Sequence, residues 1–365
     1  MQFFPLKIKN LRRETSDCVS IAFDVPGHIK PNFNFIQGQY LTLKTSIGGE
    51  EIRRSYSICS SPCDDELRIA VKRVEGGIFS TFANQKLEKG NILEVAAPDG
   101  RFYPIKTVHT EIAQKHYVLI AAGSGITPIL SILKTVLKTE PESEVTLIYG
   151  NRNTASIIFR EEIEGLKNKY MERLRVFHVL SRERMDSDLF HGRIDSFKIK
   201  QIFDKIPDLL SKETSTERGG QLTQFFICGP EDMINDVRNA LAERGVDRHN
   251  IHFELFGTNK KAANINHSLS EKVISIATIR LDGVSFDVPI HEGEAVLDAA
   301  LAVGADLPFA CKGGVCCTCR AKLTEGAVEM DVNYALDPEE VEAGFILTCQ
   351  SKPQTAKITV NFDIK

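Results

Sequence analysis

Four cysteines lie within nine residues near the C-terminal end of the chain, at 311–319, and Cys349 follows them. The total of nine cysteines is odd, and residues 1–7, MQFFPLK, lack the basic start and uninterrupted apolar stretch of a secretion signal. Clustered thiols in such a chain favour metal ligation in a reducing compartment over a disulfide framework. We therefore expect a cytoplasmic protein whose C-terminal part folds around a metal centre.

The cysteine spacing in this segment is C-x4-C-x2-C. Plant-type ferredoxins hold a 2Fe–2S cluster with this spacing, because two ferric irons and their bridging sulfides need four thiolates. We predict Cys311, Cys316, Cys319 and Cys349 as the ligands, and we interpret the extra Cys317 as a non-ligand, since using it would require C-x5-C-x-C. Buried inert thiols or a structural zinc site are the alternatives, but zinc sites usually pair two C-x2-4-C knuckles.

Charge is distributed unevenly along the chain. The 365 residues have a net charge of −4, but residues 271–365 carry 15 acidic and 8 basic side chains, so the preceding 270 residues have a net charge of +3. This balance gives no strongly basic field, and we expect no nucleic-acid partner. The longest apolar window, 117–133, is broken by glycine and proline, so we expect no membrane span.

The first hundred residues alternate short apolar and polar segments with turn residues between them. We expect strands at 18–25, 39–44, 52–58, 67–71 and 92–96. Strands at this spacing are typical of a small antiparallel barrel, which we place in residues 1–104.

Beyond the barrel region, strand-length apolar runs alternate with longer amphipathic stretches. We expect strands at 117–122, 145–149, 174–180, 224–228 and 252–256, and helices at 129–137 and 231–244. This alternation predicts a parallel sheet covered by helices over residues 112–257. The polar stretch 205–221 is interpreted as an exposed loop and 258–270 as a linker. In residues 271–365 we expect two strands meeting at Asp282-Gly283, a helix at 296–301 and a last strand at 357–362.

Two motifs in the barrel region indicate a flavin site. Arg54, Tyr56 and Ser57 come at the end of a strand, where they can meet a phosphate, an aromatic ring system and a ring nitrogen. The segment 76–81 places a glycine turn before a helical turn, whose amides can bind a pyrophosphate. The residues expected to do so are Gly77, Ser80 and Thr81. A solvated strand end and an ordinary hairpin loop capped by Ser80 are the alternatives.

A second phosphate-binding turn is expected where the first strand of the parallel sheet ends. Gly123 and Gly125 allow close backbone approach to a pyrophosphate, Thr127 can cap the following helix, and Pro128 suits its first turn. A G-x-G-x-x-G fingerprint would have glycine in place of Pro128, so this is not the usual dehydrogenase version.

Three more strand ends carry candidate binding residues, since ligands of such sheets bind at the carboxyl ends of the strands. Ser181 and Arg182 could hold a ribose 2′-phosphate, which would select NADPH over NADH. Cys228, followed by Gly229, could lie beside a nicotinamide ring, and Phe256 near a flavin. A solvated arginine, a buried cysteine and a core aromatic are the respective alternatives.

Taken together, these motifs resemble a known superfamily. Residues 1–257 resemble the ferredoxin–NADP reductase superfamily, and residues 271–365 resemble a plant-type ferredoxin. The stretches RRSYSICSSP, RIAVKRVEGGIFSTFAN and CKGGVCCTCRAKLTEGAVEM are most similar to the reductase subunits of ring-1,2-phenylacetyl-CoA epoxidases. The resemblance implies a multidomain chain with an antiparallel β-barrel that binds FAD, an α/β parallel-sheet domain that binds NADPH, and a β-grasp ferredoxin-like domain. It also implies a di-iron oxygenase as electron acceptor.

Three sites of this kind make sense as one electron path. NADPH delivers two electrons together, a 2Fe–2S cluster accepts one, and a flavin can mediate between them. We expect Ser57 near the reacting flavin nitrogen and Cys228 near the nicotinamide. The reductase of another oxygenase, such as a steroid hydroxylase, the reductase of a hybrid-cluster protein, and a redox carrier without turnover are the alternative functions.

Overall fold

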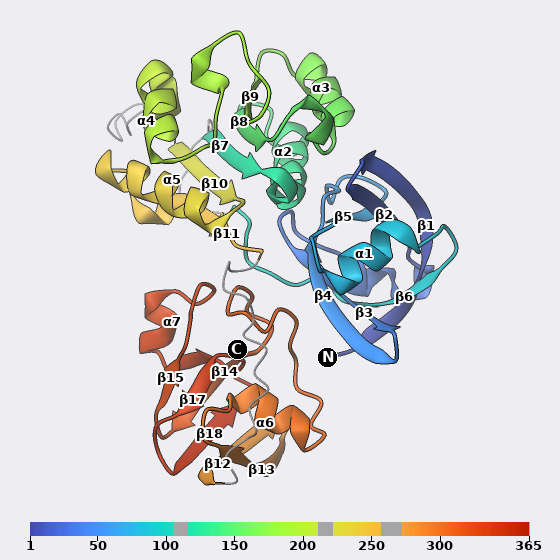
Figure 1. Cartoon of the computed structure of the whole chain (residues 1–365), viewed down its shortest axis with the longest axis vertical. Helices are drawn as coiled ribbons and strands as arrows, with labels where there is room; N and C mark the ends of the chain where they lie inside the picture. Colours follow the sequence, from blue (N-terminus) through green and yellow to red (C-terminus); the bar gives the residue numbers. More distant parts are fainter. Residues whose placement is uncertain (105–114, 211–221, 257–271, 365) are drawn as a thin grey trace. The chain divides into compact units, whose positions relative to one another are not determined.

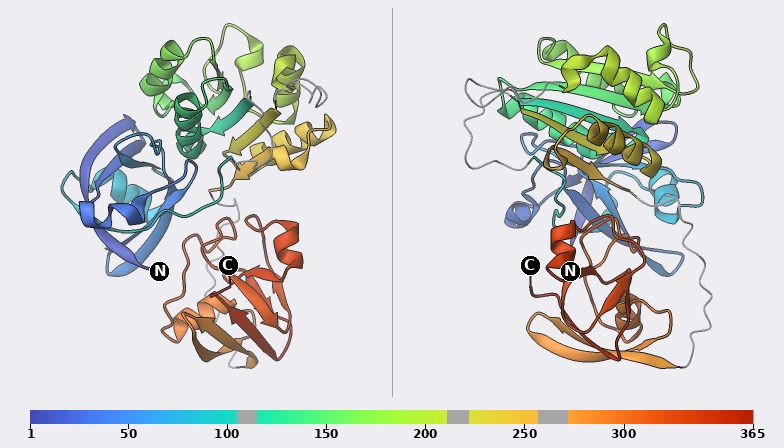
Figure 2. Two further views of the ribbon diagram at one scale, coloured as in Figure 1. Left: turned by 180° about the vertical axis from the view of Figure 1, so that it is seen from behind. Right: turned by 90° about the vertical axis from the view of Figure 1, so that its left-hand side faces the viewer.

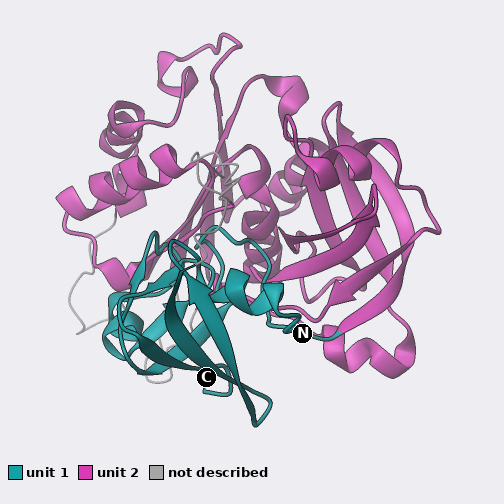
Figure 3. Cartoon of the chain, turned by 60° about the horizontal axis from the view of Figure 1, so that its bottom comes forward, with its two compact units in different colours: residues 1–2, 257–365 teal, residues 3–256 magenta. Residues whose placement is uncertain are grey.

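The structure is a computed structural model that describes residues 1–104, 115–210, 222–256 and 272–364. Two compact units divide the chain (Figure 3). One unit consists of Phe3–Phe256, and the other of Met1–Gln2 with Gly257–Lys365. The expected linker 258–270 and part of the expected loop 205–221 lie outside the described residues.

Six strands of the larger unit form one antiparallel sheet in the order β4-β3-β6-β1-β2-β5, which curves into a barrel (Figure 1). The strands are β1 (Phe3–Thr15), β2 (Cys18–Asp24), β3 (Tyr40–Ile47), β4 (Glu50–Ser57), β5 (Leu67–Lys72) and β6 (Ile92–Ala96). The five strands expected from the sequence are confirmed. The long β1 was not expected, because its only fully buried apolar side chains are Leu6 and Ile8 and charged residues surround them.

The parallel sheet has the strand order β11-β10-β7-β8-β9. Its strands are β7 (Lys115–Ala122), β8 (Glu144–Asn151), β9 (Leu174–Leu180), β10 (Leu222–Cys228) and β11 (Ile251–Glu254). The helices are α2 (Ile126–Thr139), α3 (Arg160–Lys169), α4 (Ser196–Lys205) and α5 (Glu231–Glu243), and the barrel carries α1 (Ile78–Gln85). In Figures 1 and 2, α2 and α3 lie on one side of the sheet and α4 and α5 on the other, as in a doubly wound fold.

Two details of the α/β part correct the sequence expectations. Thr127 does not cap α2, because the helix already begins at Ile126 and the Thr127 hydroxyl donates to the carbonyl of Ser124 at 3.0 Å. Pro128 lies in the first turn, as expected. The last strand, β11, ends at Glu254, so Phe256 lies beyond it, and 44% of its surface is exposed. Phe256 is therefore not a core aromatic.

The smaller unit has a mixed five-stranded sheet in the order β13-β12-β18-β14-β16, with β12 and β18 parallel. Its elements are β12 (Val273–Leu281), β13 (Val284–His291), α6 (Val296–Ala302), β14 (Arg320–Glu325), β15 (Val328–Met330), α7 (Pro338–Glu342), β16 (Phe345–Leu347), β17 (Ser351–Pro353) and β18 (Lys357–Asn361). Helix α6 buries Val296 and Leu297 in the core of this unit, as a β-grasp fold requires. The turn at Asp282-Gly283 has positive φ at both residues, which confirms the expected hairpin.

Among the described residues, no helix is both long and apolar enough to cross a membrane.

Candidate functional site

The cysteine loop of the smaller unit gathers its thiols in two pairs. The Cys316 thiol donates to the Cys311 sulfur at 3.1 Å, and the Cys319 thiol donates to Cys349. Cys316, Cys319 and Cys349 are buried, and Cys311 is half-buried. Accepting a hydrogen bond lowers the pKa of Cys311, and the same effect lowers that of Cys349.

These pairs fit a 2Fe–2S cluster. Each iron of such a cluster takes two protein thiolates, so four ligands belong in two pairs rather than around one ion. Among the described residues, no set of three or more His, Cys, Asp or Glu side chains is gathered around a single point. One iron would be held by Cys311 and Cys316, and the other by Cys319 and Cys349.

Backbone and amide groups also point at these sulfurs, as they do around Fe–S clusters. The Gly313 N–H donates to the Cys311 sulfur at 3.3 Å, and the Gln350 amide donates to the Cys349 sulfur at 3.5 Å. Gln350 was not found from the sequence, although it directly follows a ligand. The thiol of Cys317 is engaged with the Ala335 carbonyl oxygen at 3.2 Å, outside the two pairs, which supports its interpretation as a non-ligand.

The expected flavin residues end strand β4. Arg54 is exposed, and one guanidinium nitrogen donates to the Arg53 carbonyl oxygen at 2.7 Å. The Tyr56 ring is half-buried and packs on Phe79 of α1, with ring centroids 5.4 Å apart. Burial raises the pKa of Tyr56, so its hydroxyl stays protonated. Ser57 is buried.

The glycine turn before α1 is built as the sequence predicted. Gly77 precedes the helix, and a Cβ there would lie 2.4 Å from the Ser80 oxygen, so a side chain at this position would displace the Ser80 hydroxyl. The Ser80 hydroxyl donates to the Gly77 carbonyl and accepts from the Val74 N–H, which closes the turn. Thr81 lies in the first turn of α1 and is half-buried. Its backbone N–H is bonded to the Gly77 carbonyl, so the amides that α1 leaves free for a phosphate lie ahead of it.

The nucleotide turn 123–125 packs directly against the end of β10. A Cβ on Gly125 would lie 2.1 Å from the Cys228 carbonyl oxygen, and one on Gly229 would lie 3.2 Å from the Ala122 Cβ. The glycines therefore bring two strand ends together, in addition to any approach to a phosphate. Gly123 has a φ of +54°, which favours glycine.

Cys228 is fully buried at this junction, and burial raises the pKa of its thiol well above the usual range. Lys72, at the end of barrel strand β5, lies beside the same turn: its ammonium nitrogen would be 3.6 Å from a Cβ on Gly123. Lys72 was missed because a single lysine at a strand end has no distinctive spacing. It adds a cation beside the turn at which the sequence predicts phosphate binding.

The ends of β8 and β9 lie side by side. The Arg182 N–H donates to the Arg152 carbonyl oxygen at 2.7 Å, and both arginine side chains are exposed. The neighbouring Ser181 is half-buried. Glu183 fixes the loop, because its carboxylate accepts from the Thr154 N–H and hydroxyl, both at 2.7 Å. Arg152 was not predicted, since only the register of the parallel strands places it beside Arg182.

One hydrogen bond joins the flavin strand to the edge of the nucleotide sheet. The Ser57 hydroxyl donates to the Glu254 carboxyl at 3.0 Å, although the two residues are 197 positions apart. Burial raises the pKa of Glu254 to about 8, against a smaller opposing effect of the Ser57 hydrogen bond. Glu254 was not among the predicted site residues, because an isolated acid in an aromatic strand resembles a solvated strand end.

This combination defines a class of protein: a flavin- and pyridine-nucleotide-dependent reductase that carries its own ferredoxin domain. The family models agree. Residues 5–103 match the oxidoreductase FAD-binding domain, 119–239 the oxidoreductase NAD-binding domain, and 279–354 the 2Fe-2S iron-sulfur cluster binding domain.

Relatives align with the whole chain. It is 43% identical to one of the subunits of the 1,2-phenylacetyl-CoA epoxidase of Escherichia coli (strain K12), over all of this chain and 98% of that protein. It is 34% identical to the ferredoxin reductase component of 3-ketosteroid-9-alpha-monooxygenase of Rhodococcus rhodochrous, over 98% of this chain and 96% of that one. The solved structure of phthalate dioxygenase reductase shares the fold, with a TM-score of 0.61 at 22% identity, over 99% of this chain and 98% of that one.

The chain therefore belongs to the family of oxygenase reductase components in which FAD-binding, NAD-binding and 2Fe–2S domains share one polypeptide. It is an NAD(P)H-dependent oxidoreductase. The expected fold class and cofactors are confirmed at this level.

Replacing Cys349 with serine tests the ligand set. We expect C349S to lose the paramagnetic signal of the dithionite-reduced cluster and most of the iron, which should be about two atoms per wild-type chain. C317S is the matched control and should keep both. Iron analysis and electron paramagnetic resonance would measure this, and cluster loss in C317S with retention in C349S would contradict the assignment.

The raised pKa of Glu254 predicts a pH-dependent stability. Between pH ~4.5, the ordinary value for glutamate, and about 8, the folded state holds a proton that the unfolded state releases, so the free energy of unfolding falls as the pH rises. E254Q has no ionisable group at this position, so this part of the decrease in the free energy of unfolding should be absent. Wild type should therefore lose stability relative to E254Q between pH ~5 and ~8.5 in urea unfolding followed by circular dichroism.

E183Q is the control for this prediction. Hydrogen bonds from Thr154 lower the pKa of Glu183, so it is ionised in both states throughout that pH window. A wild-type-minus-E254Q difference that does not change with pH would show that Glu254 is not held protonated.

Proposed function

We propose that this chain passes electrons from NADPH, through FAD and a 2Fe–2S cluster, to a di-iron oxygenase that epoxidises the ring of phenylacetyl-CoA. The full-length identity of 43% to the epoxidase relative supports this acceptor over a steroid monooxygenase, for which the identity is 34%. The cytoplasm is the proposed location, because four cysteines are placed to bind a metal cluster and none of the nine forms a disulfide.

The proposal that electrons enter at the flavin rests on the Ser57–Glu254 hydrogen bond. This bond brings the flavin strand to the carboxyl edge of the nucleotide sheet. Bound FAD accepts two electrons from NADPH together and releases them one at a time, which a one-electron cluster requires. The chain supplies the geometry: Ser57 presents a hydroxyl beside the place of the reacting flavin nitrogen, and Glu254 orients that hydroxyl.

Two ionisable side chains at this junction are uncharged at neutral pH. Glu254 keeps its proton at neutral pH, and the buried Cys228 thiol also stays protonated. These two groups then carry no negative charge that would oppose electron transfer to the flavin. Cys228 would lie at the nicotinamide, with Gly229 leaving room beside it, and Phe256 would cover the flavin.

Phosphates would bind at the two glycine turns. The FAD pyrophosphate would meet Arg54 and the free amides at the start of α1, which lie after Gly77 and include that of Ser80, while Thr81 would offer its side-chain hydroxyl. The nucleotide pyrophosphate would meet the turn from Gly123 through Gly125 to the start of α2 at Thr127 and Pro128, with Lys72 close by.

The 2′-phosphate of NADPH would lie between the ends of β8 and β9. Ser181 can donate a hydrogen bond there, and the exposed guanidinium groups of Arg152 and Arg182 supply the charge. Electrons would leave through Cys311, Cys316, Cys319 and Cys349. The net charge of −7 on residues 271–365 favours docking to a basic surface of the acceptor.

Replacing Arg182 tests the nucleotide preference. R182A should raise the Michaelis constant for NADPH about ten- to hundred-fold, since a charge-assisted hydrogen bond contributes about 1.5–3 kcal/mol, and should change that for NADH little. Steady-state ferricyanide reduction with both nucleotides measures it. Equal effects on the two nucleotides would contradict the assignment.

Reconstitution with the oxygenase tests the acceptor. The chain, NADPH, the oxygenase subunits of a phenylacetyl-CoA epoxidase and phenylacetyl-CoA should yield the ring epoxide, detected by mass spectrometry. The rate should fall as ionic strength rises, because docking by complementary charge is screened. A 3-ketosteroid-9-alpha-monooxygenase oxygenase component serves as the comparison. Product from the steroid system alone would overturn the proposed acceptor and support the second candidate.

A further inference from the structure

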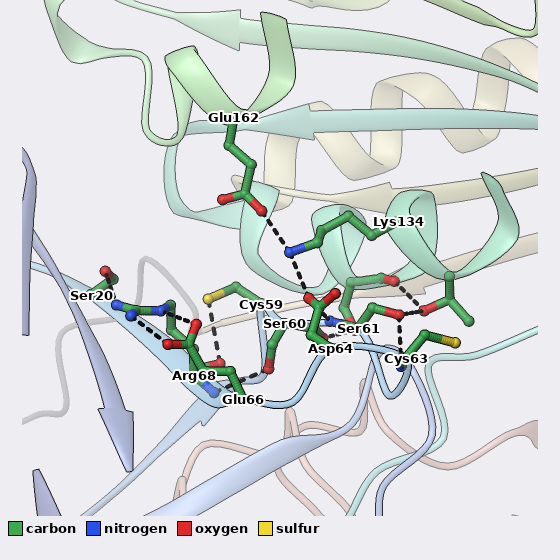
Figure 4. A network of polar contacts seen from close by, with 12 residues as sticks. Ser20, Cys59, Ser60, Ser61, Cys63, Asp64, Glu66, Arg68, Lys134 and Glu162 are labelled. Atoms are coloured by element: carbon green, nitrogen blue, oxygen red, sulfur yellow. Dashed lines mark hydrogen bonds and ion pairs between the residues drawn. The ribbon is translucent and has the colours of Figure 1, made fainter. Parts of the chain in front are cut away.

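One face of helix α2 makes buried polar contacts with residues 58–66, the barrel segment that directly follows β4 (Figure 4). The Ser131 hydroxyl donates to the Ser60 carbonyl oxygen at 2.6 Å, and the Thr135 and Ser61 hydroxyls are 2.8 Å apart. All four residues are buried. Ser131 and Thr135 are one helical turn apart, so they lie on the same face of α2.

Lys134 adds ion pairs to this contact between α2 and residues 58–66. We call Lys134 and its partners Asp64 and Glu162 the clamp. Its ammonium nitrogen lies 2.6 Å from an Asp64 carboxylate oxygen of the barrel segment and 2.5 Å from a Glu162 oxygen of α3 (Figure 4). Only 14% of the Lys134 side chain is exposed. Lys138, one turn further along α2, also pairs with Asp64, and Arg12 of β1 lies 3.9 Å from Glu162.

The charges in this clamp depend on one another. Burial alone would lower the pKa of Lys134, but Glu162 and Asp64 outweigh it and raise that pKa, so the ammonium stays charged. Without a cation between them, two partly buried carboxylates would be left underpaired. Such groups regain hydration most easily if the loop that carries one of them moves toward water.

The clamp joins two segments that directly follow the flavin strand and the nucleotide turn. Residue 58 follows Ser57, the last residue of the flavin strand, and α2 begins directly after the nucleotide turn at Gly125. Movement between segment 58–66 and α2 would therefore change the separation of the flavin strand end and the nucleotide turn. Reaction between two bound groups is sensitive to displacements of about 1 Å.

We propose that Lys134 is a positioning residue for hydride transfer: held between Asp64 and Glu162, it fixes the segment after the flavin strand onto the helix after the nucleotide turn. This role rests on the proposed entry of electrons from NADPH to FAD. Lys134 does not itself touch either cofactor in this arrangement; it sets the approach of one binding element to the other.

The test compares K134M with K167M in the full-length, cofactor-loaded protein. Lys167 is an exposed lysine of α3, and K167M removes the same charge without disturbing the clamp. In stopped-flow experiments, K134M should reduce FAD about ten- to hundred-fold more slowly at saturating NADPH, with little change in the NADPH concentration at half-saturation. The long-wavelength charge-transfer absorbance of the nicotinamide–flavin complex should weaken.

A readout independent of turnover is hydrogen–deuterium exchange. Amides of segment 58–66, including Ser61, whose N–H donates to Asp64, should exchange faster in K134M than in K167M. K134R should restore most of the reduction rate, because arginine can span the same two carboxylates. If K134M does not fold, the milder E162Q should show the same direction of change in all three measurements.

Several results separate this proposal from a purely structural role. Faster exchange in segment 58–66 with an unchanged reduction rate and charge-transfer band would overturn the positioning role. So would equal behaviour of K134M and K167M. Failure of NADPH to reduce FAD in the wild type would overturn the proposed function, and the positioning role with it, before any variant is compared.

Discussion

The hydrogen bond from Ser57 to Glu254 joins the barrel to the parallel sheet at the place where we propose that electrons enter. It joins the last residue of a barrel strand to the last residue of a strand at the edge of the parallel sheet. A flavin bound along the first and a nucleotide bound along the second would meet only if these two ends stay together. The glycines at 125 and 229 act within the α/β part, since a Cβ on Gly125 would collide with the Cys228 carbonyl and one on Gly229 would crowd Ala122 at the end of β7.

The buried polar contacts between α2 and residues 58–66 join the barrel to the α/β part at a second place. Residues 58–66 directly follow Ser57, so the barrel contacts the α/β part both at Ser57 and along α2. Neutral hydrogen bonds at Ser131 and Thr135 join α2 to residues 60 and 61, and the Lys134 ion pairs add charge-dependent contacts. Such a division gives a reductase a fixed geometry for transfer without covalent links.

Local patterns in the sequence predicted most of the fold and the cluster. The spacing of Cys311, Cys316 and Cys319 is a local property of one loop, and alternation within short segments identified most strands. Long-range contacts were not predictable in this way. The roles proposed for Glu254 and Lys134 depend on partners 197 and 70 residues away in the sequence. No sequence spacing indicates such contacts. Thr127 was misassigned because the helix starts at Ile126, two residues before the start that a cap at Thr127 would give.

The most direct test of electron transfer from NADPH through FAD to the cluster is anaerobic stopped-flow reduction by NADPH, with flavin absorbance and the cluster's paramagnetic signal followed in freeze-quenched samples. The proposed electron path requires that flavin absorbance is lost first, that the cluster signal follows, and that flavin-depleted protein shows no cluster reduction. Reduction of the cluster by NADPH at the same rate in flavin-depleted protein would contradict it, as would a flavin that is reduced while the cluster stays oxidised.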